Sequence, residues 1–308
     1  MEFVGYLLPT RDHVARGDHE VSPLVRLARR AEELGFDSVW AGDSPLTRPR
    51  ADPLTLLAAV AAVTERVTLG TAVLLPALRH PILLAHQLAT VDRIADGRLV
   101  VGVGGGFPHP NTEAQFAALQ VDFSTRISRL TESVDIIRQL WTSTGVSFQG
   151  RHFAFDDVAI GPRPARAGGP PIWLAGSGDA ALRRVARLAD GWLPYSPSPR
   201  TYARELAMIR RPVTPALYAT LCVDDDVSLA RKRMRTHIER YYNFPLELVE
   251  QIQAMFAGTA REAADWLRGY VDAGARHVVV RLAADDHDAA LERFAASVLP
   301  LLREGVPA

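Results

Sequence analysis

The chain has 308 residues, of which 48% are hydrophobic and 23% charged, and its 35 basic and 35 acidic side chains give no net charge. This composition is that of a globular protein with a large core, and the balanced charge without a basic run excludes the electrostatic footprint of a nucleic-acid-binding protein. The single cysteine, Cys222, rules out an internal disulfide, and the apolar run around it predicts a buried structural thiol.

Strand-like and helix-like segments alternate along the whole chain. Apolar runs predict strands at residues 3–8, 37–41, 67–75, 98–103, 171–175, 191–194, 215–223 and 276–282. Amphipathic helices are expected between them, the first of which opens at Ser22-Pro23 and stops at Gly35. Eight strand–helix repeats in a single domain, residues 1–308, predict an α/β fold, the closed (β/α)8 TIM barrel.

Three segments interrupt this alternation. Residues 104–123 are rich in Gly and Pro and predict a long functional loop after strand four. Residues 146–155 predict a small hairpin that turns at Gln149-Gly150, and residues 243–258 predict an irregular insertion. The barrel is therefore expected to carry insertions after strands four and seven.

The sequence contains no export or membrane signal. The N-terminal residues lack a basic segment followed by an apolar stretch of signal-peptide length, and no run approaches about 18 apolar residues. We therefore expect a cytoplasmic protein that binds neither membrane nor nucleic acid. The histidines share no metal-ligand spacing, so no metal is expected.

The loops that follow the strands build the site of a parallel barrel, so strand ends supply the candidates. Asp43 ends strand two and is placed to accept a hydrogen bond from a ring N–H or to orient a base, although Asp-Ser-Pro is also a turn signal. Thr71, Ala72 and Val73 end strand three, where ordinary packing would also explain them. His80 is expected to begin the next helix.

Gly104, Gly105 and Gly106 follow strand four. Phe107 stands where a dinucleotide fingerprint needs its third glycine, so that motif is excluded. At this position, bare main chain is expected to let a planar ring lie close. His109 lies in the same loop and is the one histidine placed near the expected site.

Gly176-Ser177-Gly178 lies between strand five and its helix. Free amides at the helix start and the Ser177 hydroxyl predict an anion site for a phosphate group. The alternative is a plain N-cap serine between turn glycines.

Four stretches resemble the bacterial luciferase-like family of flavin- and deazaflavin-dependent oxidoreductases. They are AEELGFDSVWAGDS, ERVTLGTAVLLPALRHPILLAHQLATVDRIADGRLVVGVGGGF, RLTESVDIIRQLW and GGPPIWLAGSGDAALRRVARLADGWLP, which cover most of residues 3–195. The resemblance implies a barrel whose mouth holds the ring of reduced FMN or, in one branch of the family, of the deazaflavin F420.

The resemblance also assigns cofactor-binding residues. It implies a bulge at Thr71, Ala72 and Val73 that backs the ring, often with a non-prolyl cis peptide, which maps onto Ala72–Val73. It places Asp43 beside the cofactor. The remaining matches are the loop over the ring, Gly104, Gly105, Gly106 and Phe107, and the phosphate loop, Ala175, Gly176, Ser177 and Gly178.

The chain departs from the family at the residues that move protons. Ser44 stands where many F420-dependent members have a histidine, and Phe107-Pro108-His109 stands where F420 dehydrogenases often have an acidic residue. His109 is the candidate substitute, and Asp43 and His109 are the expected catalytic residues.

We therefore expect a two-component monooxygenase, a homodimer that uses O2 and reduced FMN from a separate flavin reductase on a small organic substrate. One alternative is an F420-dependent dehydrogenase or reductase that moves hydride without O2, with Arg48, Arg50 and Arg79 near the F420 tail. The others are a non-catalytic flavin-binding relative and a barrel enzyme that acts on a sugar phosphate and has no affinity for flavin.

Overall fold

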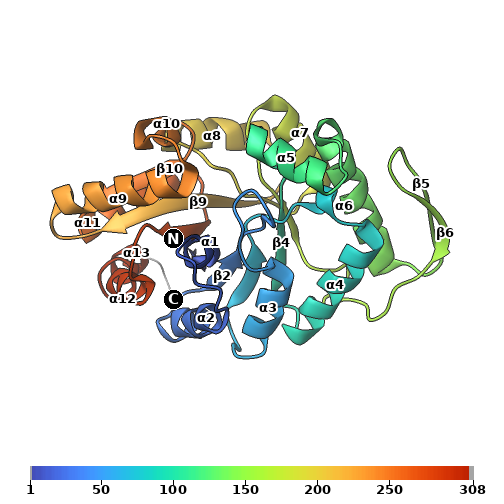
Figure 1. Ribbon diagram of the computed structural model, residues 1–308, viewed down its shortest axis with the longest axis horizontal. Helices are drawn as coiled ribbons and strands as arrows, with labels where there is room; N and C mark the ends of the chain where they lie inside the picture. The colour runs from blue at the N-terminus through green and yellow to red at the C-terminus, as the bar shows by residue number, and fades with distance from the viewer. Residues whose placement is uncertain (1, 305–308) are drawn as a thin grey trace.

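Parallel strands close into a barrel within residues 2–304, the part of the chain that the computed structural model describes. Each of eight strands pairs with the next along the chain, and β11 pairs with β1 to close the ring (Figure 1). These strands are β1 (Phe3–Leu7), β2 (Ser38–Ala41), β3 (Thr68–Thr71), β4 (Leu99–Val103), β7 (Ile172–Leu174), β8 (Gly191–Trp192), β9 (Thr214–Val223) and β11 (His277–Leu282). The predicted TIM barrel is confirmed.

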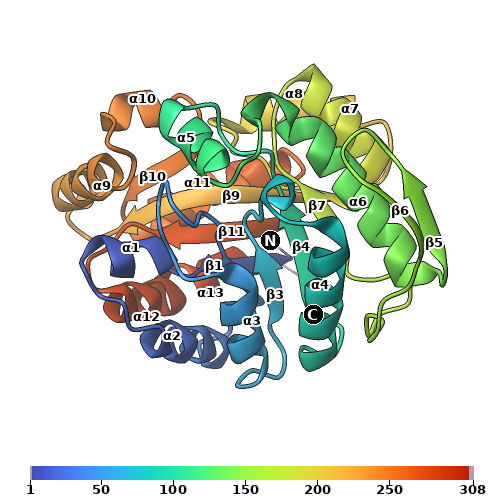
Figure 2. The ribbon, with the colours of Figure 1, turned by 45° about the vertical axis from the view of Figure 1, so that its right-hand side comes forward.

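Helices lie between successive strands and cover the outside of the barrel (Figure 2). The larger ones are α2 (Ser22–Glu33), α3 (Pro53–Ala61), α4 (Pro81–Ile94), α6 (Arg126–Thr142), α7 (Asp179–Leu188), α8 (Pro199–Met208), α9 (Val227–Tyr242), α11 (Ala260–Asp272) and α12 (His287–Ser297), followed by the short α13 (Leu299–Arg303). As expected, α2 has Pro23 in its first turn, and Gly35 at φ +87° follows its last turn.

The barrel interior is filled by aromatic side chains. Trp40 of β2 and Trp173 of β7 lie with ring centroids 5.2 Å apart, and the buried His277 packs edge-on against both. A Cβ at Gly70 or Gly191 would overlap with one of the two indoles. Glycine in β3 and β8 therefore makes room for tryptophan in the neighbouring strands, and the lower barrel is a packed core rather than a pore.

The segment after β4 is not the loop that its glycines and prolines suggested. It contains α5 (Pro110–Ala118) and a 3-10 turn, η2 (Phe123–Thr125). His109 is the N-cap of α5 and Pro110 its first residue. The loop prediction was wrong because proline is also favoured at the first position of a helix.

The segment 243–258 is also ordered, which corrects the second expected irregular region. It contains α10 (Leu246–Glu250) and β10 (Ala254–Gly258). The last half of the long strand β9 extends past β8 and pairs in parallel with β10. Only the two end residues of β10 are buried, so the strand has no alternating apolar pattern to reveal it.

Three smaller features complete the fold. The expected hairpin exists as β5 (Val146–Gln149) and β6 (Ala154–Val158) and stands at the edge of the molecule (Figure 1). The expected third strand, 67–75, is shorter, because β3 ends at Thr71 and the 3-10 turn η1 (Pro76–Leu78) follows. A short helix, α1 (Thr10–Ala15), follows β1 and was not predicted.

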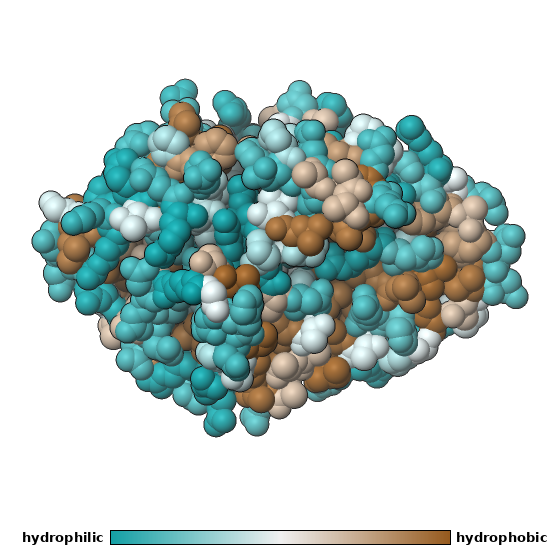
Figure 3. Space-filling view, in the orientation of Figure 1, coloured by the Kyte–Doolittle hydropathy of each residue, from teal (hydrophilic) through white to brown (hydrophobic). Residues whose placement is uncertain are grey.

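Cys222 is buried, as predicted, and burial raises the pKa of its thiol to about 11. Among the described residues, no helix combines the length and apolarity that crossing a membrane requires. Figure 3 shows a mostly hydrophilic surface over α9 and α1, with apolar groups more frequent on the side of α4 and α6.

Candidate active site

The predicted site residues follow four strands that are neighbours in the barrel. The order β2-β3-β4-β7 sets the ends of these parallel strands side by side. Asp43 follows β2, Ala72–Val73 follows β3, Gly104 follows β4 and Ala175 follows β7. The topology therefore brings the four predicted segments to one end of the barrel.

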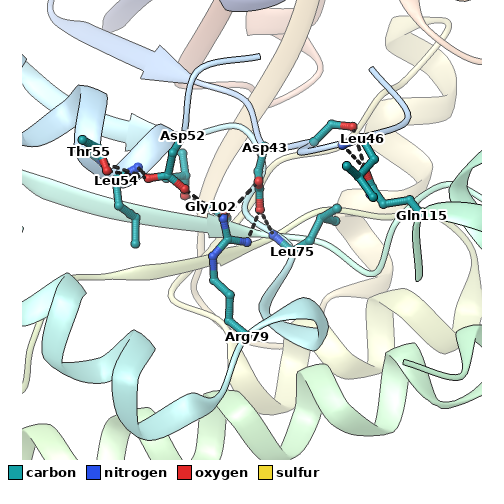
Figure 4. A network of polar contacts seen from close by, with 11 residues as sticks. Asp43, Leu46, Asp52, Leu54, Thr55, Leu75, Arg79, Gly102 and Gln115 are labelled. Atoms are coloured by element: carbon teal, nitrogen blue, oxygen red, sulfur yellow. Dashed lines mark hydrogen bonds and ion pairs between the residues drawn. The ribbon is translucent and has the colours of Figure 1, made fainter. Parts of the chain in front are cut away.

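Asp43 is held by an arginine and a main-chain amide (Figure 4). Arg79 donates from Nη1 to Asp43 Oδ2 at 2.5 Å and from Nη2 to Oδ1 at 3.1 Å, and the Leu75 amide donates to Oδ2 at 2.9 Å. The Asp43 side chain is only 2% exposed. Arg79 also contacts Asp52, at 3.2 Å. Burial alone would lower the pKa of Arg79, but the two carboxylates outweigh burial and raise it.

These contacts give Asp43 a role that the sequence did not predict, since it fixes the segment between β3 and α4. A contact between Asp43 and a cofactor stays a prediction. Arg79 serves the same ion pair, so it is not a free cation for the tail of a cofactor, as the sequence had suggested.

The structure has a cis peptide bond between Ala72 and Val73, as the resemblance implied. The chain here is tied to β4, because the Thr71 hydroxyl donates to the Gly102 carbonyl at 2.7 Å and the Leu74 amide donates to the same carbonyl at 2.8 Å. The Thr71 side chain is fully buried and engaged in this way. Ala72 and Val73 therefore remain the candidates for contact with a ring.

On the side where a Cβ would point, the glycines after β4 meet protein side chains. A Cβ at Gly104 would lie 2.7 Å from the Val73 side chain, and a Cβ at Gly105 would overlap with Ile127. Gly106 has φ +83° and faces Phe116. The space beside these residues is filled by protein side chains, so their observed role is packing. A contact between their main chain, or the 54% exposed Phe107, and a ring stays a prediction.

His109 joins the two insertions. Its Nδ1 accepts a hydrogen bond from the Asn111 amide at 3.2 Å and so caps α5. Its ring packs edge-on against Phe244, which precedes α10, at a centroid distance of 5.5 Å. In Figure 2, α5 and α10 lie at the same end of the barrel. The imidazole Nε2 is the nitrogen left to exchange a proton.

Ser44, the residue that replaces the family's histidine, is occupied by local contacts. Its hydroxyl donates to Gln115 Oε1 at 3.1 Å and accepts from the Arg48 amide at 3.1 Å. The same Gln115 oxygen accepts from the amides of Leu46 and Thr47, each at 3.0 Å. Gln115 therefore anchors the segment after β2 to α5. No sequence pattern predicted this role.

The loop from Ala175 to Gly178 leads into α7, and its last residues are exposed. Gly178 has φ +79° and open space where a Cβ would point. The loop is braced from below, because the Gly178 amide donates to Glu205 at 3.2 Å and the Trp192 indole donates to the Gly176 carbonyl at 2.9 Å. The exposed helix start is accessible to a phosphate group.

Two arginines lie on this side of the mouth, one beside the loop after β4 and one on α7. The alkyl chain of Arg126 borders Gly105, and Arg184 lies on α7 close enough to Arg126 for their charges to interact. Burial and then repulsion by Arg126 lower the pKa of Arg184. No ion pair within 4.0 Å involves either arginine among residues 2–304. The Arg126 guanidinium is committed to Phe123, because its Nη1 donates to the Phe123 carbonyl at 3.1 Å and its central carbon lies 4.0 Å from the ring centroid. Asp179 in the first turn of α7 would oppose an anion there.

A polar cavity that the sequence did not predict lies on the other side of the mouth. Arg11, Arg50, Tyr241 and Arg281 are among the residues that line a narrow cavity at the ends of β1 and β11. One signal was present: Val279 faces the barrel interior, so alternation along β11 also turns Arg281 inward. Arg50 also reaches the ring side of the site, since a Cβ at Gly42 would overlap with its guanidinium and lie 3.4 Å from the Ala72 carbonyl.

Comparison with known proteins gives one family and consistent relatives. The family described as luciferase-like monooxygenase matches residues 1–277. The F420-dependent glucose-6-phosphate dehydrogenase of Intrasporangium calvum is 32% identical, over 91% of this chain and 94% of the relative. The enzyme of the same description from Amycolatopsis mediterranei is 30% identical with the same coverage of both chains.

Solved structures agree on the architecture. Monooxygenase RslO1 from Streptomyces bottropensis superimposes with a TM-score of 0.83 at 25% identity, over 97% of this chain and 99% of that one. An F420-dependent secondary alcohol dehydrogenase gives a TM-score of 0.81 at 20% identity, over 98% and 99%.

Proposed function

The chain belongs to the luciferase-like monooxygenase family of oxidoreductases, and we propose that it moves hydride between F420 and a small hydroxyl or carbonyl compound. The observation that carries this proposal is the similarity, over nine-tenths of the chain, to F420-dependent glucose-6-phosphate dehydrogenases. It replaces the first expectation from the sequence, a two-component FMN monooxygenase, with the alternative.

The residues at the barrel mouth fit such a cofactor at two points. The amides that start α7, with Arg184 on the same helix, would hold its phosphate. The Ala72–Val73 peptide would back the ring. When bound, F420 supplies a hydride acceptor and donor. The protein's own tasks are then to orient the substrate, to exclude water and to take or return the substrate's proton.

His109 stays the proposed group for that proton transfer. Ser44 and Asp43 are engaged by Gln115 and Arg79, respectively, whereas the imidazole Nε2 of His109 has no such engagement in its capping role. Replacing His109 by asparagine keeps a side-chain acceptor for the helix cap and removes the imidazole. We expect this variant to lose most of its turnover and to keep its stability.

A monooxygenase that uses reduced FMN from a partner reductase is the second candidate. The similarity to RslO1 over nearly the whole chain favours it. In this case the mouth would have to protect a reactive flavin from water.

The two candidates are separated by one assay in two atmospheres. The purified chain is mixed with oxidised F420 and a panel of sugar phosphates and secondary alcohols, and the visible absorbance of F420 is followed without O2. We expect substrate-dependent reduction that proceeds without O2. Turnover only with reduced FMN and O2 would overturn the proposal in favour of the second candidate.

A further inference from the structure

Three arginines surround one tyrosine at the barrel mouth, across the ring of strands from α7. Arg11 follows β1, Arg50 lies after β2 and Arg281 lies near the end of β11. The guanidinium carbons of Arg11 and Arg281 lie 4.3 and 4.5 Å from the ring centroid of Tyr241. Arg50 Nη2 donates to the Tyr241 hydroxyl at 3.1 Å. We call Arg11, Arg50 and Arg281 the arginine cluster.

Donors in the arginine cluster remain unused. Arg281 is only 3% exposed. Its Nε donates to the Thr220 hydroxyl and its Nη1 to the Tyr242 hydroxyl, each at 3.1 Å. Its Nη2 and the Nη1 of Arg11 are buried without a hydrogen-bond partner in the described part of the chain. Buried donors of this kind are rare in native proteins and call for a partner.

The buried carboxylate near the arginine cluster, Asp12, acts on Arg281 at a distance and not through an ion pair. No member of the arginine cluster forms an ion pair with a carboxylate within 4.0 Å among residues 2–304. Asp12 is the carboxylate in the cavity wall, and its Oδ2 lies 3.5 Å from His287 Nε2. Burial lowers the pKa of Arg11 to about 10. For Tyr241, burial would raise the phenol pKa, but the three arginines outweigh it and lower the pKa.

The cavity lies next to a larger groove. The inner cavity holds about 10 Å³, enough for about one water molecule. The neighbouring groove holds about 340 Å³ and shares Thr10 and Arg50 with the cavity. A volume of this size suits a small organic molecule. Arg50 thus links the groove, the inner cavity and the peptide that would back the ring.

We propose that the arginine cluster binds an oxyanion, a phosphate or a carboxylate, carried by the substrate. The oxyanion takes the unused guanidinium donors and neutralises part of the buried positive charge. The body of the substrate extends from Arg50, which borders both the groove and the Ala72 carbonyl. Calling the ligand a substrate depends on the proposed hydride transfer, whereas the oxyanion site itself does not.

The test is calorimetric titration of the full chain, without cofactor, with three probes. Phenyl phosphate and benzoate carry the two oxyanions on the same apolar body, and benzyl alcohol is the uncharged control. We expect at least one anionic probe to bind with more than tenfold higher affinity than benzyl alcohol, and the stronger probe identifies the oxyanion. Equal affinity for all three probes would overturn the proposal.

Variants locate the binding. Arg50→Gln and Arg11→Gln should each weaken binding of the stronger anionic probe tenfold or more. Arg281 is buried, so it is replaced by lysine, which keeps the charge and lets the chain fold; this variant should also weaken binding of the probe. One matched control should stay within twofold of the parent: Arg231→Gln, which removes an exposed ion pair on α9. Loss of binding in Arg184→Gln with full binding in Arg50→Gln would place the anion at α7 and refute the assignment.

A separate titration with F420 keeps the two proposals distinguishable. If F420 does not bind while phenyl phosphate or benzoate still depends on Arg50, the oxyanion site stands and the proposed function fails. If F420 binds and the anionic probes ignore the arginine cluster, the oxyanion site fails alone.

Discussion

The pair of carboxylates on Arg79 offers a matched test of what Asp43 does. Replacing Asp43 by asparagine should lower the free energy of unfolding by about 3 kcal/mol, because breaking a buried ion pair leaves the remaining charge poorly compensated. The same replacement at Asp52 should cost less than about 1 kcal/mol, the range of exposed pairs. Both changes remove one charge and keep the side-chain size.

The difference follows from burial and from the second partner. The Asp43 side chain is 2% exposed, whereas that of Asp52 is 50% exposed, and Arg79 is 20% exposed. Asparagine at position 52 also keeps the N-cap of α3, since Asp52 accepts from the amides of Leu54 and Thr55. In the Asp43 variant, Arg79 still pairs with Asp52. We therefore expect the loss in free energy of unfolding to lie at the lower end of the range for a broken buried ion pair.

Urea denaturation of the parent and both variants at neutral pH, followed by far-UV circular dichroism, gives the three free energies. Equal losses for the two variants would contradict the account. An unchanged stability of the Asp43 variant with abolished turnover would also contradict it and would restore a direct catalytic role.

Three further predictions concern the barrel interior, the contact between the segment after β2 and α5, and the glycines at two strand ends. Burial lowers the pKa of His277 from 6.5 to about 3, so on acidification this residue takes up a proton in the unfolded chain before it does so in the folded one. The free energy of unfolding is therefore unaffected by His277 above pH 6.5 and about 2 kcal/mol lower at pH 5. Urea titrations at pH 7 and 5 should show this loss, and His277→Gln should remove it; an equal loss in the variant would refute the assignment. Gln115→Leu should release residues 44–48 and speed amide hydrogen exchange there at least tenfold, and unchanged exchange would show that the anchor is dispensable. Gly102→Ala should prevent folding, because its Cβ would overlap with the main chain of β3, whereas Gly178→Ala should cost only about 1 kcal/mol for its positive φ; similar melting temperatures would contradict the packing argument.

The barrel could be predicted because its signal is repeated. Apolar strands and amphipathic helices recur eight times, so an error at one boundary does not change the topology. β10 was not predicted because its three central residues are partly exposed and its pairing depends on how far β9 extends past β8. That overhang is a tertiary property that a local pattern cannot contain.

The structure brings the predicted residues Asp43, Ala72–Val73 and the α7 start to one end of the barrel, as the strand-end rule requires. Their contacts could not be predicted. The packing of the glycines after β4 could not be foreseen, because an absent side chain looks the same in sequence whether a ligand or a neighbour such as Val73 fills the space. The arginine cluster was missed because Arg11, Arg50 and Arg281 come from three distant parts of the chain.

The central claim is that the barrel mouth is built for F420. Equilibrium binding tests it most directly, by quenching of F420 fluorescence on addition of the chain, with a parallel anaerobic titration of reduced FMN. We predict saturable F420 binding at least tenfold tighter than that of reduced FMN and weakened at least tenfold in Arg184→Gln. Tighter binding of reduced FMN, or no saturable binding of F420, would contradict the claim.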